Sequence, residues 1–498
     1  MRTPSKPDLL LRGGLVIDGS GAPAVRADVA ITKGRISAIG DLSGVAAREV
    51  ISIEGRVLAP GFIDVHTHDD LICLTDPDMT PKVSQGVTTV IVGNCGISAG
   101  PVRFADTVTE PFNLLGDRDA FRYATYADYV AAIDEARPRI NIAALVGHST
   151  LRVQHMANLE RPADATEITA MAAALDAALK AGALGLSSGV FYAPARAADI
   201  PELTALAAVV ARARGVYTTH IRDEYDEVVE ALEEAFTVAA PQRVPLVISH
   251  HKCAGVHNWG RSVETLRHID AARRRQPVYM DCYPYTAGST VIRDDLADGE
   301  IEVLVNWSEP HPEMAGRKLK CIAVDWDVTE AEAARRLAPG GASYFQIHED
   351  DMRRILSHDG CMIGSDGLPN DPLPHPRLWG TFPRVLGRYA RELGLLSLEQ
   401  AVHKMTGLSA KTFGLRDRGL IAEGMAADLT VFDAATVLDT ATYADPQAIA
   451  AGIDYVFVNG VLSWRHGQAP AERAGRFLRR GEREAVSPET QLTESAAS

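Results

Sequence analysis

Eight short apolar runs alternate with stretches of helical period between residues 62 and 366, and this alternation constrains the fold more than any other feature. Strand and helix repeated eight times are typical of a parallel (β/α)8 barrel of the TIM type. Stretches such as EITAMAAALDAALKAG and DEVVEALEEAFTVAA have the length and period of helices. The predicted strands are FIDVHTH, TTVIVGNC, INIAALVGH, ALGLSSG, VYTTHI, PLVISHH, VYMDCYPY and CMIGSD.

The two chain ends follow a different pattern of short strands broken by Gly and Asp, and the asparagine-glycine in VFVNGVLSW predicts a hairpin. We predict that residues 1–59 and 420–480 pair into one small β-sandwich beside a barrel of residues 60–419. The connection from Thr286 to Gly360 is too long for a loop and a helix, so we expect an inserted subdomain over 286–346, between strands seven and eight. The polar tail 481–498 is predicted to be disordered.

Composition limits the class of protein. The chain has 498 residues and is 46% hydrophobic, which is enough for a large core and more than one compact domain. A formal net charge of −15 without a dense basic cluster argues against nucleic-acid partners. The six cysteines are scattered and form no disulfide framework. The N-terminus lacks the apolar region of a signal peptide, and no apolar run reaches transmembrane length. We therefore predict a soluble, cytoplasmic protein without a membrane partner.

Polar side chains gather where the predicted strands end. In a parallel barrel the carboxyl ends of the strands meet on one rim, which is where such barrels carry their chemistry. Imidazole, thiolate and carboxylate are the ligands that zinc prefers. A single His-x-His pair is weak evidence, but ligands at four other strand ends make a metal site the best interpretation. The candidates are His66, His68, Cys95, His220, His250 or His251, and Asp366.

Several of these residues also fit a simpler role. Cys95 can be a small buried residue between glycines, and Asp366 can form an Asx-turn in IGSDG. Strand alternation lets only one of His250 and His251 face inward; the pattern hardly separates them, and we choose His250. His148, at the end of strand three, can contact the site or only hydrogen-bond to loops.

The motifs resemble a known family. GRVLAPGFIDVHTHDD and MTGLSAKTFGLRDRGLIAEGMAADLTVFD are similar to the start and the end of the barrel in the amidohydrolase superfamily, which consists of metal-dependent hydrolases. Strand four ends in Ser187 and Ser188, where many members carry a bridging carboxylated lysine. Together with GNCG, THIRDE, SHHK, YPYTAGST and GSDGLPNDPLPHPRLWGTFPRVLG, this departure resembles the N-acyl-D-amino-acid deacylases, or D-aminoacylases.

The resemblance implies a zinc enzyme that hydrolyses the amide of an N-acyl-D-amino acid to a carboxylate and a free D-amino acid. It implies a tight zinc held by Cys95, His220 and His250. A second, weaker site would use His66, His68 and Asp366, with Cys95 bridging. Asp366 is also implied as the general base that takes a proton from the metal-activated water.

The resemblance also implies a clamp for the substrate carboxylate made of Lys252, Tyr283 and Arg377, with help from Ser289. Arg293 opens the insert and can face the substrate side chain or pair with Asp294 or Asp295. The alternatives in function are a cyclic amidase of the hydantoinase or dihydroorotase type, and a non-catalytic scaffold that kept the barrel. The preferred side chain, the acyl group, the metal in the cell and the oligomeric state stay open.

Overall fold

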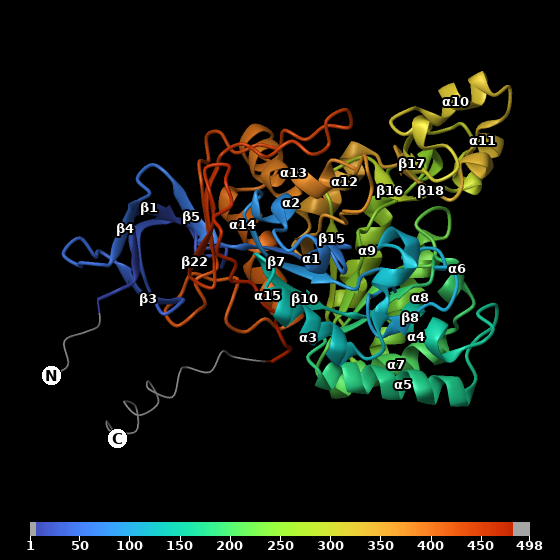
Figure 1. The fold of residues 1–498 in the computed structure, drawn as a ribbon, viewed down its shortest axis with the longest axis horizontal. Helices are drawn as coiled ribbons and strands as arrows, with labels where there is room; N and C mark the ends of the chain where they lie inside the picture. Colours follow the sequence, from blue (N-terminus) through green and yellow to red (C-terminus); the bar gives the residue numbers. More distant parts are fainter. Residues whose placement is uncertain (1–5, 482–498) are drawn as a thin grey trace.

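A computed structural model describes residues 6–481, and its centre is a set of parallel strands (Figure 1). Each of the eight predicted apolar runs contains a strand, and the third run is interrupted at Leu145. The strands are β6 (Phe62–Asp64), β7 (Val87–Val92), β10 (Asn141–Ala144), β11 (Val146–Gly147), β12 (Gly185–Gly189), β13 (Val216–His220), β14 (Leu246–Ile248), β15 (Val278–Cys282) and β19 (Cys361–Ile363).

The parallel pairings run in chain order and return to the first strand. One sheet has the order β10-β7-β6, and the other has the order β11-β12-β13-β14-β15-β19. The two sheets are continuous through the chain between β10 and β11. Between β19 and β6 the contact is slight: one parallel bridge joins Thr67 to Gly367, and Val65 N donates to Ile363 O over 3.4 Å. All pairings place the carboxyl ends of the strands on one rim.

Helices connect successive strands, and both predicted helices are present as α5 and α8. Helix α5 begins at a capping box, in which Asp164 and Glu167 each accept from the backbone N–H of the other. Buried residues recur every three or four positions along α8, which packs its apolar face on the strands. The main helices are α3 (Tyr126–Ala136), α4 (His148–His155), α5 (Ala165–Lys180), α7 (Ile200–Arg212), α8 (Val228–Ala239), α9 (Ser262–Arg273), α12 (Glu349–Ser357), α13 (Arg377–Arg384), α14 (Leu398–Met405) and α15 (Gly407–Phe413). Short helices α1 (Ile72–Thr75) and α2 (Thr80–Val83) follow β6.

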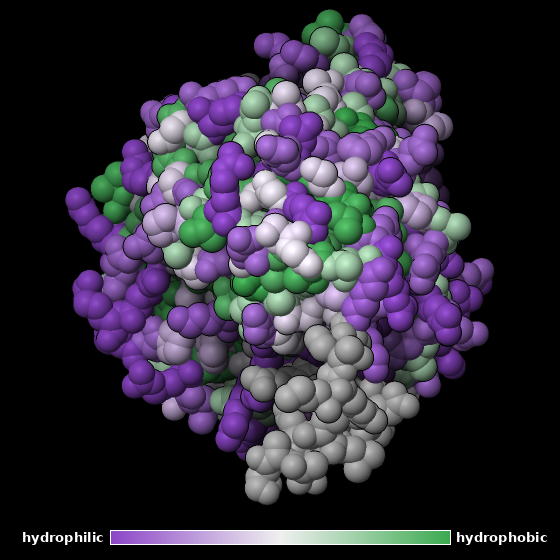
Figure 2. Space-filling view, turned by 90° about the vertical axis from the view of Figure 1, so that its left-hand side faces the viewer, coloured by the Kyte–Doolittle hydropathy of each residue, from purple (hydrophilic) through white to green (hydrophobic). Residues whose placement is uncertain are grey.

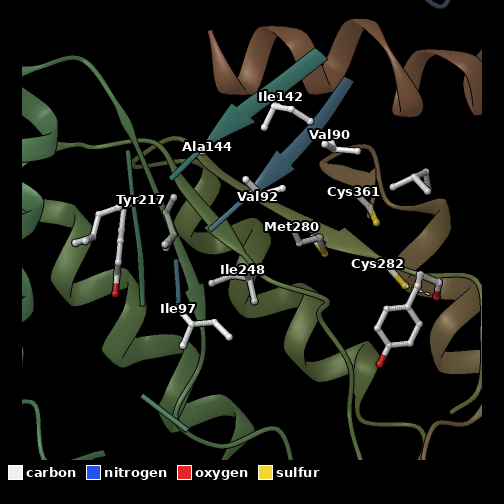
Figure 3. Close-up of a cluster of buried hydrophobic side chains, with 14 of the residues drawn as sticks. Val90, Val92, Ile97, Ile142, Ala144, Tyr217, Ile248, Met280, Cys282 and Cys361 are labelled. Atoms are coloured by element: carbon white, nitrogen blue, oxygen red, sulfur yellow. Dashed lines mark hydrogen bonds between the residues drawn. The ribbon is translucent and has the colours of Figure 1, made fainter. Parts of the chain in front are cut away.

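The hydrophobic core has two parts because successive residues of a strand point to opposite faces. Figure 3 shows side chains of the larger part, including Val90 and Val92 on β7 and Ile142 and Ala144 on β10. This part packs against helices. The smaller part takes the alternate positions, such as Ile91 and Ala143, together with side chains of α15. The strands are thus buried on both faces, which leaves their carboxyl ends as the place for polar groups.

The two chain ends build one hydrogen-bonded sheet, visible at the left of Figure 1. Strand β1 pairs with β2 on one side and with both β4 and β5 on the other, and β5 pairs antiparallel with β20. The predicted asparagine-glycine hairpin joins β21 to β22, with both turn residues at positive φ. The face of the molecule at this end is mostly hydrophilic, with a patch of apolar side chains (Figure 2). The strands are β1 (Leu9–Val16), β2 (Val25–Thr32), β3 (Arg35–Gly40), β4 (Glu49–Ser52), β5 (Val57–Pro60), β20 (Leu429–Phe432), β21 (Ile453–Val458) and β22 (Val461–Arg465).

Between β15 and α12 the chain forms a separate antiparallel sheet with its own small core. We call residues 286–346 the insert, and Figure 1 shows much of it projecting at the upper right. Its sheet has the order β16-β18-β17, and two helices pack on it. Its elements are β16 (Gly288–Val291), β17 (Val303–Ser308), α10 (Leu319–Asp325), α11 (Glu330–Leu337) and β18 (Gly340–Tyr344).

Within residues 6–481, no helix combines the length and the apolarity needed to cross a bilayer. The predicted disordered tail lies outside the described residues, apart from Gly481.

Candidate metal and substrate site

The two histidines of the opening His-x-His pair lie just beyond β6. The strand ends at Asp64, whereas the predicted strand FIDVHTH continues to His68. Both imidazoles nevertheless converge on one carboxylate, because Asp366 Oδ1 lies 3.5 Å from His66 Nε2 and 3.3 Å from His68 Nε2. The first and the last strand of the series therefore contribute to one cluster.

Cys95 lies at the centre of this cluster. Its Sγ is 3.2 Å from His66 Nε2 and 3.4 Å from His250 Nε2. One donor atom each from His66, Cys95, His250 and Asp366 can be chosen so that all lie within 4.8 Å of one another, and all four residues are buried. A thiol, two imidazoles and a carboxyl so close together can hold a zinc ion.

Three of these residues have an uncommon backbone conformation, which directs their side chains into the cluster. Cys95, His250 and Asp366 have φ of 53°, 35° and 50°, in the left-handed region. The turn at His250 separates it from its neighbour. His250 faces Cys95, while His251 Nε2 lies 2.9 Å from Thr265 Oγ1 on α9. Strand alternation alone does not reveal this difference.

His220 ends β13 and lies beside His250, with 4.4 Å between the ring centroids. It is 5% exposed, yet within residues 6–481 neither of its ring nitrogens has a hydrogen-bond partner. Buried polar groups are normally satisfied, so a buried imidazole with no hydrogen-bond partner beside a thiol has a nitrogen available to bind a metal. A metal ion fits this position and the donor set around it.

The electrostatics favour the ionised forms of both acidic groups. Burial by itself raises the pKa of the Cys95 thiol, but the imidazoles of His66 and His250 outweigh burial and hold that pKa well below its usual range. Burial also raises the pKa of Asp366, and here Arg377 and His250 outweigh it and hold the pKa well below its usual range. Thiolate and carboxylate are the forms that coordinate metal ions.

Two carboxylates that the sequence analysis did not select lie close to ring nitrogens of these imidazoles. Asp281 lies within 3.3 Å of His66 Nδ1 and accepts from His250 N over 2.9 Å. Glu224 Oε1 lies 3.0 Å from His250 Nδ1, and Glu224 Oε2 lies 3.7 Å from His220 Nε2. The sequence contains a signal for both, since Asp281 is the acidic residue near the end of strand seven and Glu224 follows His220 by four residues.

Of the residues predicted to bind the substrate carboxylate, Lys252, Tyr283 and Ser289 line one cavity at the cluster, and Arg377 contacts two residues of its lining, Asp366 and Tyr283. Arg377 Nη1 pairs with Asp366 Oδ2 at 2.9 Å, and its guanidinium lies over the Tyr283 ring at 4.6 Å. Lys252 Nζ lies 2.5 Å from Glu224 Oε1. Ser289 lines the same cavity, and its carbonyl oxygen accepts from Arg377 Nη2 over 3.1 Å. The cavity is lined by His68, Leu114, Phe191, Tyr192, His220, Glu224, Tyr225, His250, Lys252, Tyr283, Gly288, Ser289, Thr290, Leu296, Tyr344, Gln346, Asp366 and Leu368.

His148 does not reach this cavity. It is fully buried, and its Nε2 lies 2.8 Å from Glu202 Oε1 on α7, within a cluster that also contains Arg152. A role for His148 in substrate binding therefore has no support in the geometry. His148 contacts a helix residue, Glu202 of α7, and not a loop, so the geometry also differs from the second role that the sequence left open.

Arg293 lies at the rim. Its Nε donates to Asp295 over 2.8 Å, while Asp294 pairs with Arg335. The guanidinium also lies 4.5 Å above the ring of Phe191, which lines the cavity. Arg293 is thus neutralised locally and separated from the metal cluster by an aromatic ring.

Known proteins resemble this chain over nearly its whole length. The Amidohydrolase family profile matches residues 49–308 and 320–464. D-aminoacylase from Alcaligenes xylosoxydans xylosoxydans is 49% identical, with 95% of this chain and 98% of that protein covered. N-acyl-D-glutamate deacylase from the same organism is 48% identical, with 97% and 99% covered. A solved N-acyl-D-glutamate deacylase from Bordetella bronchiseptica, complexed with zinc and a phosphonate inhibitor, is 47% identical with a TM-score of 0.93, covering 95% of this chain and 100% of that one.

The chain belongs to the amidohydrolase family and, within it, to the N-acyl-D-amino-acid deacylases. The resemblance predicted from the motifs is confirmed.

At strand four, Ser188 Oγ lies 2.7 Å from Tyr217 Oη and 2.8 Å from Thr219 Oγ1, so the end of this strand is filled by a hydroxyl network.

Proposed function

We propose that this protein is a zinc-dependent N-acyl-D-amino-acid deacylase, which hydrolyses the amide bond to a carboxylate and a free D-amino acid. The main support is that one ligand atom each of Cys95, His66, His250 and Asp366 lie within 4.8 Å of one another, beside the guanidinium of Arg377. Relatives with 48–49% identity bear the names of this activity, and one solved relative contains zinc.

We assign the tight zinc to Cys95, His220 and His250, and a weaker second site to His66, His68 and Asp366 with Cys95 between them. Bound zinc would activate water at neutral pH and polarise the amide carbonyl. Asp366 would take the proton of the attacking water and pass it to the leaving amine. Its position between the two histidines and Arg377 allows this transfer within one cavity.

Arg377, Lys252, Tyr283 and Ser289 would hold the substrate carboxylate. Within the described part of the chain, Arg377 Nε is buried without a hydrogen-bond partner, so it keeps a free donor for an incoming oxygen. A guanidinium can meet a carboxylate with two parallel hydrogen bonds. Anchoring this end of the substrate would place the amide carbonyl beside the metal ligands.

The test of this function is a panel of N-acetyl-D and N-acetyl-L amino acids, read as released amine with and without chelator. We expect release from D substrates alone, and none after metal removal. Hydrolysis of hydantoins or dihydroorotate instead would assign the cyclic-amidase alternative. A protein that binds zinc but turns over no member of either panel would support the scaffold alternative.

Metal content is the first specific prediction. After dialysis against a weak chelator, the purified protein should retain one zinc per chain. The set of Cys95, His220 and His250 combines the thiolate with two imidazoles, whereas the weaker set of His66, His68 and Asp366 only shares that thiolate. A strong chelator should remove this zinc and the activity, and one equivalent of zinc should restore both. Elemental analysis by mass spectrometry provides the readout. Full activity in protein free of transition metals would contradict the assignment.

Side-chain preference gives a second prediction. The cavity wall contains Phe191, Leu114, Leu296 and Leu368, and Arg293 is already paired with Asp295, so we expect a neutral D-amino acid to be preferred over an acidic one. Arg293→Ala should change kcat/KM for N-acetyl-D-leucine and N-acetyl-D-glutamate by the same factor, because the guanidinium contacts Phe191 of the cavity wall, which both substrates share. A loss confined to the glutamate substrate would show that Arg293 recognises the side chain.

We further propose that the returning series of parallel pairings is a (β/α)8 barrel over residues 60–419, that 286–346 is an inserted subdomain, and that residues 1–59 and 420–480 form the accompanying β-sandwich. The cytoplasmic location stays a prediction.

A further inference from the structure

Lys82 is a buried cation that the reaction does not use. Its side chain on α2 is 1% exposed. Its Nζ donates to Asp64 Oδ2 over 2.8 Å, to Thr67 Oγ1 over 2.9 Å and to Ser365 Oγ over 2.8 Å. An ammonium has three protons, so this group is fully satisfied by three partners. Asp64, together with Asp69 at 3.3 Å, offsets the buried charge.

These partners flank candidate metal ligands that lie just beyond two different strands, β6 and β19. Thr67 lies between His66 and His68, and Ser365 precedes Asp366. Asp64 strengthens the same link, because its Oδ1 accepts from Ser365 N over 2.8 Å. The ammonium of Lys82 thus lies at the point where the end of β6 meets the end of β19.

The backbone at this seam is weakly paired. The other adjacent strands of the parallel series share ladders of two to five residue pairs. By contrast, β6 and β19 are joined by the single bridge from Thr67 to Gly367 and the long Val65–Ile363 hydrogen bond. Two further backbone bonds cross the seam beyond the strands, from Asp366 N to His66 O at 2.7 Å and from His68 N to Gly367 O at 3.0 Å. Side chains around Lys82 thus add to three backbone hydrogen bonds that join these two strand ends.

We propose that Lys82 is a positioning residue that sets the spacing between Asp366 and the His66–His68 pair, and so the affinity of the weaker metal site. The proposal rests on the metal assignment of the proposed function. The hydrogen bonds and ion pairs of Lys82 go to Asp64, Thr67, Ser365 and Asp69, and none goes to the tight set of Cys95, His220 and His250, so the affinity of that set should not depend on Lys82. Partners behind metal ligands commonly contribute 10- to 100-fold in metal affinity.

The test measures binding of a second divalent zinc ion to the one-zinc protein by calorimetric titration, without substrate. Lys82→Met should weaken this second binding by about 10- to 100-fold. Thr67→Val and Ser365→Ala each remove one partner of Lys82 while keeping the charge balance, together with the bond of that hydroxyl to Asp69 or Asp64. Each should weaken the second binding by about fivefold or more, since one lost hydrogen bond already costs about 1 kcal/mol. Ser365→Ala should add little on top of Lys82→Met, because both changes break the same network.

Lys404→Met is the matched control. Lys404 is a second buried lysine, and its Nζ donates to His358 O and Cys361 O at the start of β19, away from the metal cluster. The Lys404→Met substitution should leave the dissociation constant of the second zinc ion unchanged. If Lys82→Met does not fold, as judged by circular dichroism, the two neutral variants still decide the matter.

Unchanged second-zinc affinity in folded Thr67→Val and Ser365→Ala, an equal loss in Lys404→Met, or no second zinc bound by the wild type would each overturn the proposal. Because no substrate enters this titration, a wild type that fails the amino-acid panel refutes the proposed activity and leaves this result intact.

Discussion

Cys95→Ala should lose the tight zinc and more than about 10²-fold in turnover. Partners that only support a metal ligand contribute up to about 100-fold, and Cys95 is assigned as a ligand itself. Strand four offers no replacement ligand, since its end carries Ser188 and not a lysine, and the hydroxyl of Ser188 is engaged by Tyr217 and Thr219. Glu224, which lies with His220 and His250, supplies a carboxylate and no thiolate to that group. Zinc content and kcat, measured on the same preparation, provide the readout.

Two other cysteines serve as controls for this substitution. Cys73 is buried, with its Sγ 3.3 Å from Asp70 O, so Cys73→Ala should affect packing alone. Cys321 is exposed on the insert, and Cys321→Ala should change nothing measurable. Full zinc and a normal rate in Cys95→Ala would show that the bridging assignment is wrong.

Asp366→Asn should lower kcat by at least about 10²-fold while the tight zinc stays bound, because the substitution removes the proton acceptor and general base catalysis is worth 10²–10⁴-fold. Asparagine tolerates the left-handed backbone at this position, so the loop should keep its shape. The measurement is steady-state kinetics on the best D substrate, with zinc content determined in parallel.

Asp359→Asn provides the comparison for this effect. Asp359 is exposed and lies just before β19, at the end opposite Asp366, and its loss should leave kcat within about twofold, as for other surface changes. Near-normal turnover in Asp366→Asn would mean that another group accepts the proton.

Much of this architecture is readable in the sequence because burial on both faces makes a central strand continuously apolar. Each of the eight apolar runs contains a strand, and the residues just after the runs meet because parallel strands end on one rim. Cys95, His220 and Asp366 were selectable on that ground alone. The family then follows from motif order, and near full-length relatives at 48–49% identity agree with it.

Other features depend on contacts between residues far apart in sequence. No local pattern shows that His148 turns to Glu202, or that Arg293 pairs with Asp295 over the ring of Phe191. The choice between His250 and His251 depends on a left-handed turn that strand alternation does not contain. The carboxylates behind the imidazoles, Glu224 and Asp281, become visible only when the strands are assembled.

The left-handed backbone at Cys95, His250 and Asp366 also bears on how heat-resistant this protein can become. For residues other than glycine such conformations cost of the order of 1–3 kcal/mol each, and aspartate and histidine adopt them more often than cysteine. That is a sizeable part of the ~5–15 kcal/mol that stabilises a typical domain. Glycine at residue 95 or 250 would relieve the strain and delete the ligand in one step. Selection for thermal stability and selection for turnover therefore oppose each other at these two positions.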